Sequence, residues 1–262
     1  MHLQKIEGNG KESVLFLHGF LESGSVWSSW LNQESWDEDL FIPDLPGHGN
    51  SPEWEEDKGF ADWGQFLINK IDELKDPGKK IHIIGHSMGG YMAMEMALLF
   101  PSRIGKLVLL HSTPFPDTPV QIQRRKKQIE LIEKGRKSLL IKNVGLAMLA
   151  PANRDRLLIS GRKLNREAAN CSASGMVKAL NAIMNRSGYR NVVKAKMRDI
   201  LLVTGDQDPF MPPDYYKTVI SHFPEISHHC FPDCGHASFI EKPEASLRIV
   251  KAFINSPIYK HH

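Results

Sequence analysis

Cysteine is scarce in this sequence, and long apolar runs are absent. Cys171, Cys230 and Cys234 leave one cysteine over after any pairing, which fits a reducing compartment better than a disulfide framework. The first residues, MHLQKIE, lack the apolar stretch of a secretion signal, and nowhere do about 18 apolar residues run together as a membrane span requires. We therefore expect a cytoplasmic protein without a membrane span.

Internal repeats and low-complexity segments are also missing, and the composition suggests neither disorder nor a fibrous architecture. The composition, 41% hydrophobic and 24% charged, is that of an ordinary globular protein. A chain of 262 residues is long enough for one large core. We expect a single domain with room for an inserted subdomain.

Short apolar runs alternate with stretches of helical spacing along most of the chain. The runs predict strands at Val14–Leu17, Leu40–Ile42, Ile81–Ile84, Leu107–Leu110 and Ile200–Val203. The stretches between them predict helices near 25–36, 60–75, 88–100, 212–223 and 243–255. This order indicates an α/β fold with a mostly parallel central sheet and helices on both faces, and such a sheet binds ligands at the carboxyl ends of its strands.

The alternation stops between residues 113 and 190, where helical patterns such as 120–133 and 154–169 follow one another. We predict a helical lid at 113–190, inserted in a core formed by 1–112 and 191–262. The insertion holds 16 Lys and Arg against five Asp and Glu, whereas the remainder holds 17 against 25. This charge could attract an anionic substrate or an acidic carrier protein. The solvated face of amphipathic helices explains it more simply, and no nucleic-acid-binding module accompanies it.

A nucleophile motif follows the predicted strand at 81–84. The letters GHSMGG occupy residues 85–90, and a helix with small residues at Gly89, Ala93 and Ala97 comes next. In the G-x-S-x-G spacing the serine occupies a sharp strand-to-helix turn that flanking side chains would obstruct. Ser87 is therefore the predicted nucleophile.

A serine hydroxyl needs a neighbouring imidazole to accept its proton. His236 follows the apolar-to-loop segment Cys230–Gly235, near the end of one further, last strand, and comes after Ser87 in the order this motif requires. His228 and His229 come earlier in that strand. The acid that orients the imidazole should end the preceding strand. Asp208, just before Pro209, is favoured over Asp206, which suits a turn.

Two backbone N–H groups should bind the oxyanion of a tetrahedral intermediate. Met88 supplies the first because it follows the nucleophile, and Phe20, in the loop after the strand at 14–17, supplies the second. His18 is interpreted as a brace for that loop. Residues 44–51 are interpreted as a structural loop.

Metal binding receives little support from the spacing of Cys230, Cys234 and His236, since no fourth ligand is evident. We expect neither a metal nor a cofactor.

Together these motifs resemble the α/β-hydrolase superfamily, and within it the small lidded serine esterase-like branch. The matching residues are His18–Phe20, Asp44–Ser51, Gly85–Gly90, Gly205–Asp208 and Gly235–His236. The resemblance covers the sheet domain and implies a sheet of eight or slightly fewer strands, a Ser-His-Asp triad, no cofactor and ester-type substrates. Ser87 argues against haloalkane dehalogenases and epoxide hydrolases, which use aspartate as nucleophile. Menaquinone-pathway lyases of this superfamily have arginine after the paired glycines, where this chain has Tyr91.

The predicted activity is acyl transfer to water, with a small carboxylic ester as substrate and thioesters or lactones as close alternatives. A lyase that uses the same triad without hydrolysis is a second hypothesis, and a catalytically weak ligand-binding receptor is a third. The expected partner is a small acyl compound, anionic if the basic lid faces it. The oligomeric state is left open.

Overall fold

Seven strands form one sheet in the computed structural model, which describes residues 1–9, 12–54, 58–75 and 77–258. Their order across the sheet is β1-β3-β2-β4-β5-β6-β7. The strands span Leu3–Ile6 (β1), Ser13–Leu17 (β2), Asp39–Pro43 (β3), Ile81–His86 (β4), Ile104–Leu110 (β5), Ile200–Gly205 (β6) and Ser227–Phe231 (β7). All neighbours pair in parallel except β1, which runs antiparallel to β3 at one edge.

The five predicted strands all lie within observed ones, and the predicted fold class is confirmed. Continuous apolar runs predicted strands that are covered on both faces, and β2, β4, β5 and β6 are buried along their full length. The edge strand β1 was not predicted, because its alternating burial leaves only a weak apolar signal.

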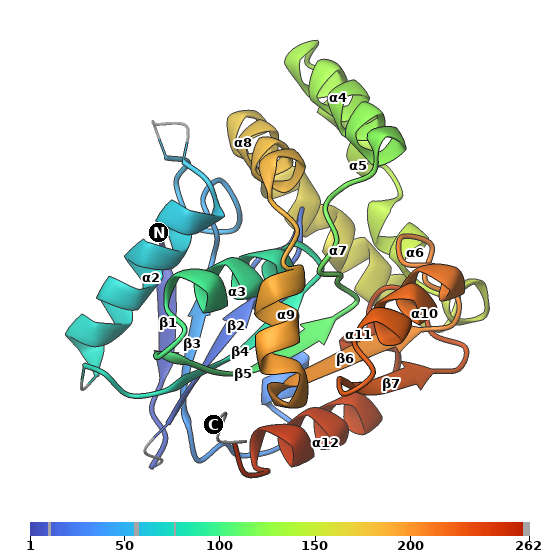
Figure 1. Cartoon of the computed structure of the whole chain (residues 1–262). Helices are drawn as coiled ribbons and strands as arrows, with labels where there is room; N and C mark the ends of the chain where they lie inside the picture. Colours follow the sequence, from blue (N-terminus) through green and yellow to red (C-terminus); the bar gives the residue numbers. More distant parts are fainter. Residues whose placement is uncertain (10–11, 55–57, 76, 259–262) are drawn as a thin grey trace.

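Helices cover both faces of this sheet (Figure 1). Leu15, Ile83 and Leu109 point to one face and pack with residues of the first group of helices. That group comprises α2 (Phe60–Leu74), α3 (Met88–Leu99), α9 (Arg190–Lys196) and α10 (Pro213–His222). The alternate residues Val14 and Ile84 point to the other face, where the second group packs. It comprises the 3₁₀ turn η1 (Gly24–Trp27), α1 (Ser28–Leu31), α11 (Ser238–Glu241) and α12 (Pro243–Ile254).

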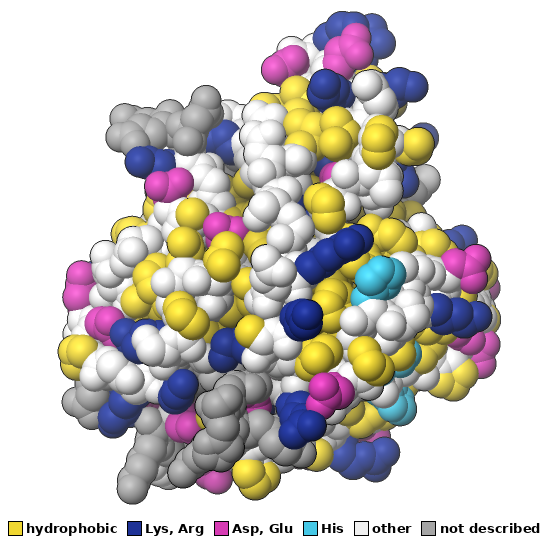
Figure 2. Space-filling view, viewed as in Figure 1, with side chains coloured by type: hydrophobic (Ala, Val, Ile, Leu, Met, Phe, Trp, Pro, Cys, Tyr) yellow, Lys and Arg dark blue, Asp and Glu magenta, His cyan; other side chains and the backbone are white. Residues whose placement is uncertain are grey.

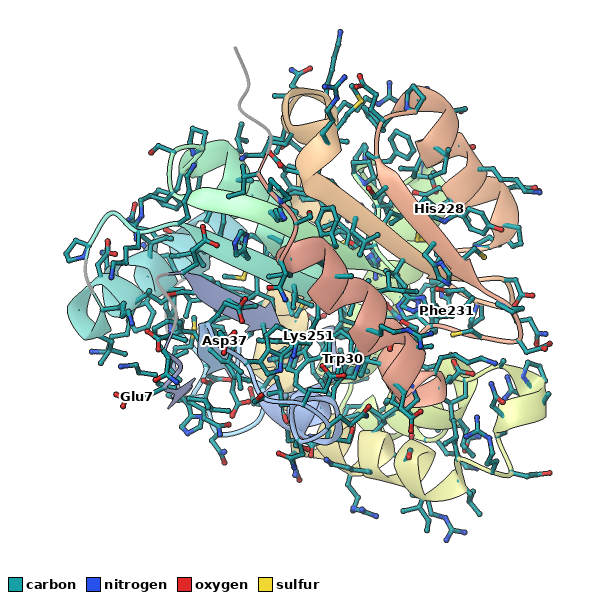
Figure 3. The ribbon with its side chains drawn as sticks, turned by 90° about the horizontal axis from the view of Figure 1, so that it is seen from below. Glu7, Trp30, Asp37, His228, Phe231 and Lys251 are labelled. Atoms are coloured by element: carbon teal, nitrogen blue, oxygen red, sulfur yellow. The ribbon has the colours of Figure 1, made fainter. Side chains whose placement is uncertain are left out.

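The helix expected near 25–36 is shorter than predicted. It consists of η1 and the single turn α1, and residues 32–35 are exposed, so nothing holds further turns against the sheet. Trp27 and Trp30 are fully buried, and Trp30 Nε1 donates a hydrogen bond of 2.9 Å to the carbonyl of Pro243 at the start of α12. Figure 3, which labels Trp30 and Lys251, shows α12 on this side of the molecule.

Between β5 and β6 the chain forms a run of helices without a strand in the described residues. It begins with α4 (Pro119–Glu133), α5 (Lys137–Ile141), α6 (Val144–Met148) and the 3₁₀ turn η2 (Pro151–Asn153), and it continues with α7 (Leu158–Asn170), α8 (Ala173–Asn185) and α9. A separate small core that includes Ile132, Ala168 and Leu180 holds the run together. Figure 1 shows α4 and α8 standing away from the sheet, and Figure 2 shows Lys and Arg side chains gathered at the outer tip of this projection. None of the helices in the described part of the chain combines the length and the apolarity that crossing a bilayer requires.

Candidate active site

Ser87 occupies a strained turn between β4 and α3. Its φ of 48° and ψ of −109° are unusual for a residue with a side chain. The turn is held in place because Ser87 N–H donates to the carbonyl of Leu110 and the Ser112 hydroxyl donates to the carbonyl of Ser87. A side chain on Gly85 would collide with the backbone of Gly89, so the motif glycines are required by the close packing of this turn.

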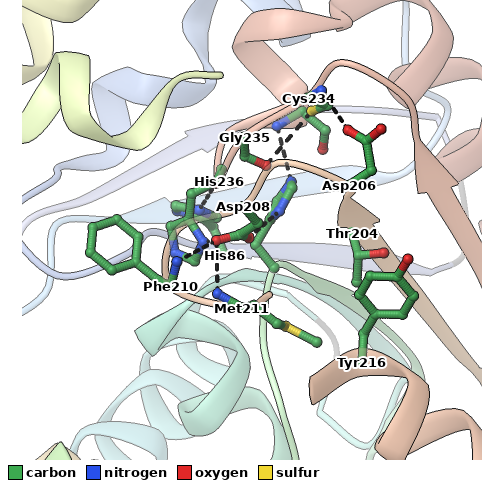
Figure 4. Close-up of polar contacts among 12 residues, drawn as sticks. His86, Thr204, Asp206, Asp208, Phe210, Met211, Tyr216, Cys234, Gly235 and His236 are labelled. Carbon is green, nitrogen blue, oxygen red and sulfur yellow. Dashed lines mark hydrogen bonds and ion pairs between the residues drawn. The ribbon is translucent and has the colours of Figure 1, made fainter. Parts of the chain in front are cut away.

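Asp208 lies at the end of β6 and accepts four hydrogen bonds. Its Oδ2 accepts a hydrogen bond of 2.7 Å from Nδ1 of His236 (Figure 4). The same oxygen accepts a hydrogen bond of 2.9 Å from Nδ1 of His111. Its Oδ1 accepts hydrogen bonds from the backbone N–H groups of Phe210 and Met211. Burial alone would raise the pKa of Asp208, but the two imidazoles hold that pKa well below its usual range. Asp208 is therefore an ionised acceptor that fixes the orientation of His236.

The tautomer of His111 follows from its partners. Ser238 N–H donates to Nε2 of His111, so the proton of the neutral ring is on Nδ1 and is donated to Asp208. Burial lowers the pKa of His111 to about 4 although Asp208 opposes this shift, which keeps the ring neutral at pH 7. His236 likewise donates from Nδ1, which leaves its Nε2 for another partner.

Ser87 and His236 line the same cavity, which has a volume of about 170 Å³. His111 lines it beside them. No hydrogen bond joins Ser87 Oγ to His236 in the described chain, and such bonds commonly tighten only when substrate binds. The ring of Phe210 covers the outer side of His236, with 4.9 Å between the ring centres.

A second buried acid–imidazole pair lies behind Ser87. His86 Nδ1 lies 2.9 Å from Oε2 of Glu22, and His86 Nε2 lies 2.8 Å from the carbonyl of His236. Both partners are acceptors, so both ring nitrogens must carry a proton and His86 is an imidazolium. Burial opposes this charge, but Glu22 raises the pKa of His86 above its ordinary value. The same Glu22 oxygen accepts the backbone N–H of Gly19 at 2.7 Å, so this pair joins the loop after β2, the end of β4 and the loop that carries His236.

The loop after β2 carries the predicted second oxyanion donor, and Phe20 lines the cavity. Among the hydrogen bonds of the described residues, none is donated by the backbone N–H of Phe20 or of Met88. His18 braces this loop as expected, because its Nε2 accepts the N–H of Leu45 and its Nδ1 bonds to the carbonyl of Gly19.

The loop that carries His236 is fastened to the helical run between β5 and β6. His236 N–H donates to the carbonyl of Met148 at 2.7 Å. The buried carboxylate of Glu241 accepts the N–H of Gly235 at 2.7 Å and that of Ala150 at 2.9 Å, and it also accepts the side-chain amide of Asn153. The two regions therefore share hydrogen bonds beside the site.

The structure brings Asp208 to His236 and places Asp206 elsewhere, where it accepts the backbone N–H of Cys234. Sequence reasoning missed His111, Glu22 and the role of His86. The spacing of Cys230 and Cys234 does not produce a metal site with His236 in the described residues. The group whose ligand atoms lie within 4.8 Å of one another consists of His111, Asp208 and His236, and the hydrogen bonds described above account for that proximity.

The chain belongs to the alpha/beta hydrolase family. The family model described as "alpha/beta hydrolase fold" matches residues 12–243, most of the chain.

Among its relatives is a 2-hydroxy-6-oxononadienedioate/2-hydroxy-6-oxononatrienedioate hydrolase from Pseudomonas sp. It is 26% identical over 94% of this chain and 89% of the relative. Among solved structures, a thermophilic esterase from Thermogutta terrifontis has a TM-score of 0.88 at 21% identity, covering 97% of this chain and 92% of that one. The enol-lactonase from Burkholderia xenovorans LB400 has a TM-score of 0.84 at 16% identity, covering 97% and 96%. These two likenesses show a shared fold.

Proposed function

We propose that this protein is a serine hydrolase that cleaves a small carboxylic ester, thioester or lactone. The observation that carries the proposal is the Asp208–His236 hydrogen bond, formed in the same cavity that Ser87 enters from its strained turn. An imidazole whose Nδ1 is held by a carboxylate and whose Nε2 is available is the general base that a serine nucleophile needs.

In the proposed reaction Ser87 Oγ attacks the carbonyl carbon while Nε2 of His236 accepts the hydroxyl proton. The N–H groups of Phe20 and Met88 bind the oxyanion, and Asp208 stabilises the imidazolium that forms. The imidazolium then protonates the leaving alcohol, which gives an acyl-enzyme on Ser87. Water, deprotonated by the same Nε2, attacks the acyl-enzyme, and the imidazolium returns this proton to Ser87 Oγ as the acid is released.

We also propose that residues 113–190 act as a lid. Gln121, Arg124 and Gln128 of α4 line the cavity opposite Ser87, together with Met148 from α6. A cover of this kind restricts the entry of water and strengthens electrostatic interactions in the site.

Hydrolysis of a carbon–carbon bond beside a ketone is a second candidate, favoured by the curated relative. The name of that relative's substrate denotes a ketone with two carboxylates and no ester. The same nucleophile and base could act on such a ketone.

Fluorophosphonate labelling with peptide mapping tests the serine mechanism, run beside a panel of 4-nitrophenyl esters and the relative's dienedioate. We expect covalent label on Ser87 and a fall in kcat of at least about 10⁴-fold in Ser87→Ala. Ser221→Ala is the matched control, because that serine is exposed on α10, does not line the cavity and donates its hydroxyl only to the carbonyl of Thr218 in the same helix. Label on another residue, or ester turnover that survives Ser87→Ala, would refute the mechanism. Turnover of the dienedioate alone would select the second candidate.

A further inference from the structure

The side of the cavity formed by α4 differs in charge from the side that holds Ser87. Arg124 and Arg125 line it, and Phe210 stands between Arg124 and the proposed base. The Arg124 guanidinium carbon lies 5.9 Å from the centre of the Phe210 ring, whose other neighbour is His236. A single phenyl ring therefore separates this cation from the reacting groups.

Arg124 carries a charge that no described acidic side chain neutralises. Asp117 accepts Nε of Arg125 and also pairs with Arg186 at 2.8 Å, so this one carboxylate serves two guanidiniums. The single acidic residue in the described lining is Glu22, which pairs with His86. Arg124 itself forms no ion pair within the described chain. The α4 side therefore has a net positive charge.

Apolar and polar side chains share the rest of the lining. Tyr91, Met148, Phe210 and Met211 contribute to it. The volume of about 170 Å³ is similar to that of cavities that hold a benzene-sized molecule, roughly 150 Å³. The chemistry that fits is a short apolar chain with the reacting carbonyl at one end and an anion at the other.

We propose that Arg124 is a specificity-determining residue and that the substrate is an acyl compound whose chain ends in a carboxylate. The guanidinium binds the carboxylate while the carbonyl lies at Ser87. This inference rests on the proposed hydrolase function. Because Arg124 is exposed at the mouth of the cavity, the attraction falls as salt screens it.

The kinetic test compares mono-4-nitrophenyl adipate, which carries a carboxylate, with 4-nitrophenyl heptanoate, a neutral ester of similar length. In Arg124→Gln we expect kcat/KM for the adipate to fall about tenfold, while the value for the heptanoate stays within about twofold. Lys126→Gln is the matched control: it removes the same charge from an exposed position of the same helix that does not line the cavity. It should change neither value, and 0.5 M salt should reduce the adipate preference of the wild type.

A binding test separates this inference from the proposed catalysis. Calorimetry on Ser87→Ala should show that monomethyl adipate binds about tenfold more tightly than methyl heptanoate, and the double variant Ser87→Ala/Arg124→Gln should lose this difference. Equal binding of the two esters to Ser87→Ala, or equal losses in Arg124→Gln and Lys126→Gln, would overturn the role of Arg124. A preference for the anion in binding, with no label on Ser87 and no ester turnover by the wild type, would overturn the hydrolase proposal and leave the anion site standing.

Discussion

Two buried acid–imidazole pairs contribute residues to the cavity that Ser87 lines, and they differ in which ring nitrogens are occupied. His86 uses both nitrogens, one on Glu22 and one on the carbonyl of His236. His236 uses Nδ1 on Asp208 and keeps Nε2 for the cavity. His86, next to the proposed nucleophile in sequence, is therefore a charged structural residue, whereas His236, 150 positions later, has a ring nitrogen available to accept a proton.

The two carboxylates differ in the same sense. Asp208 accepts four hydrogen bonds, two of them from imidazoles, and Oδ2 alone holds both rings. Glu22 uses one oxygen for Gly19 and His86, and its Oε1 has no partner among the described residues. Asp208, with hydrogen bonds to both oxygens, fixes the orientation of the His236 ring. Glu22 neutralises the buried charge of His86 and so holds the surrounding segments together. The first pair should matter most for rate and the second for stability.

The variant Asp208→Asn should distinguish the roles of the two pairs most clearly. The amide cannot hold both imidazoles in their present tautomers, so we expect kcat for an ester to fall about 10⁴-fold. Stopped assays with a 4-nitrophenyl ester measure kcat. Asp206→Asn is the neighbouring control, and its kcat should stay within a few-fold of the wild-type value. A loss of equal size in both variants would mean that the loop, rather than the carboxylate at His236, had been disturbed.

Breaking the second pair should be seen mainly in folding. Glu22→Gln leaves the buried imidazole of His86 without its counter-charge, so we expect the free energy of unfolding to fall by about 3 to 5 kcal/mol in urea titrations. Glu34→Gln, which removes the exposed partner of Lys251, should change it by less than about 1 kcal/mol. The double variant Glu22→Gln/His86→Gln should be less damaged than the sum of its single variants, and simple additivity would argue against the pair.

A smaller effect distinguishes His111 from the charged His86. The pKa of folded His111 is about 4, below the 6.5 of an unfolded histidine, so the unfolded chain binds more protons between these values. Its contribution to the free energy of unfolding is therefore lost as pH falls from 6.5 toward 4, by about 2 kcal/mol at pH 5. Asn tolerates the positive φ of 51° at this position, and His111→Asn should reduce the difference in stability between pH 7 and pH 5 by this amount. An unchanged difference would mean that His111 is protonated in the folded state.

The sequence was sufficient for features that local sterics and chain order decide. The turn at Ser87 needs glycine at fixed positions, and Asp208 follows a strand that could be recognised by its apolarity. His236 is assigned by its order and placement in the chain, because β7, with the letters SHHCF, has no apolar run. His111 could have been found by the rule that applies to Asp208, because it directly follows β5 at the edge where Ser87 and Asp208 lie.

The remaining features depend on contacts between distant segments. Glu22 and His86 are 64 positions apart, and nothing in either neighbourhood shows that the two side chains meet. Helical spacing likewise could not show which cations of the basic segment face the cavity, and the structure selects Arg124 and Arg125 from a run of four.

The helical run lies between the strands β5 and β6, which suggests that it could simply be replaced by another insert. Glu241 makes such a replacement more difficult. Two of the four donors to this carboxylate, Ala150 and Asn153, belong to that run, and the other two, Cys234 and Gly235, precede His236. A foreign insert in place of residues 113–190 would leave the buried carboxylate of Glu241 without the donors Ala150 and Asn153, next to the loop that carries the proposed base. An engineered chimera would therefore have to keep residues 148–153 or replace Glu241 together with the insert.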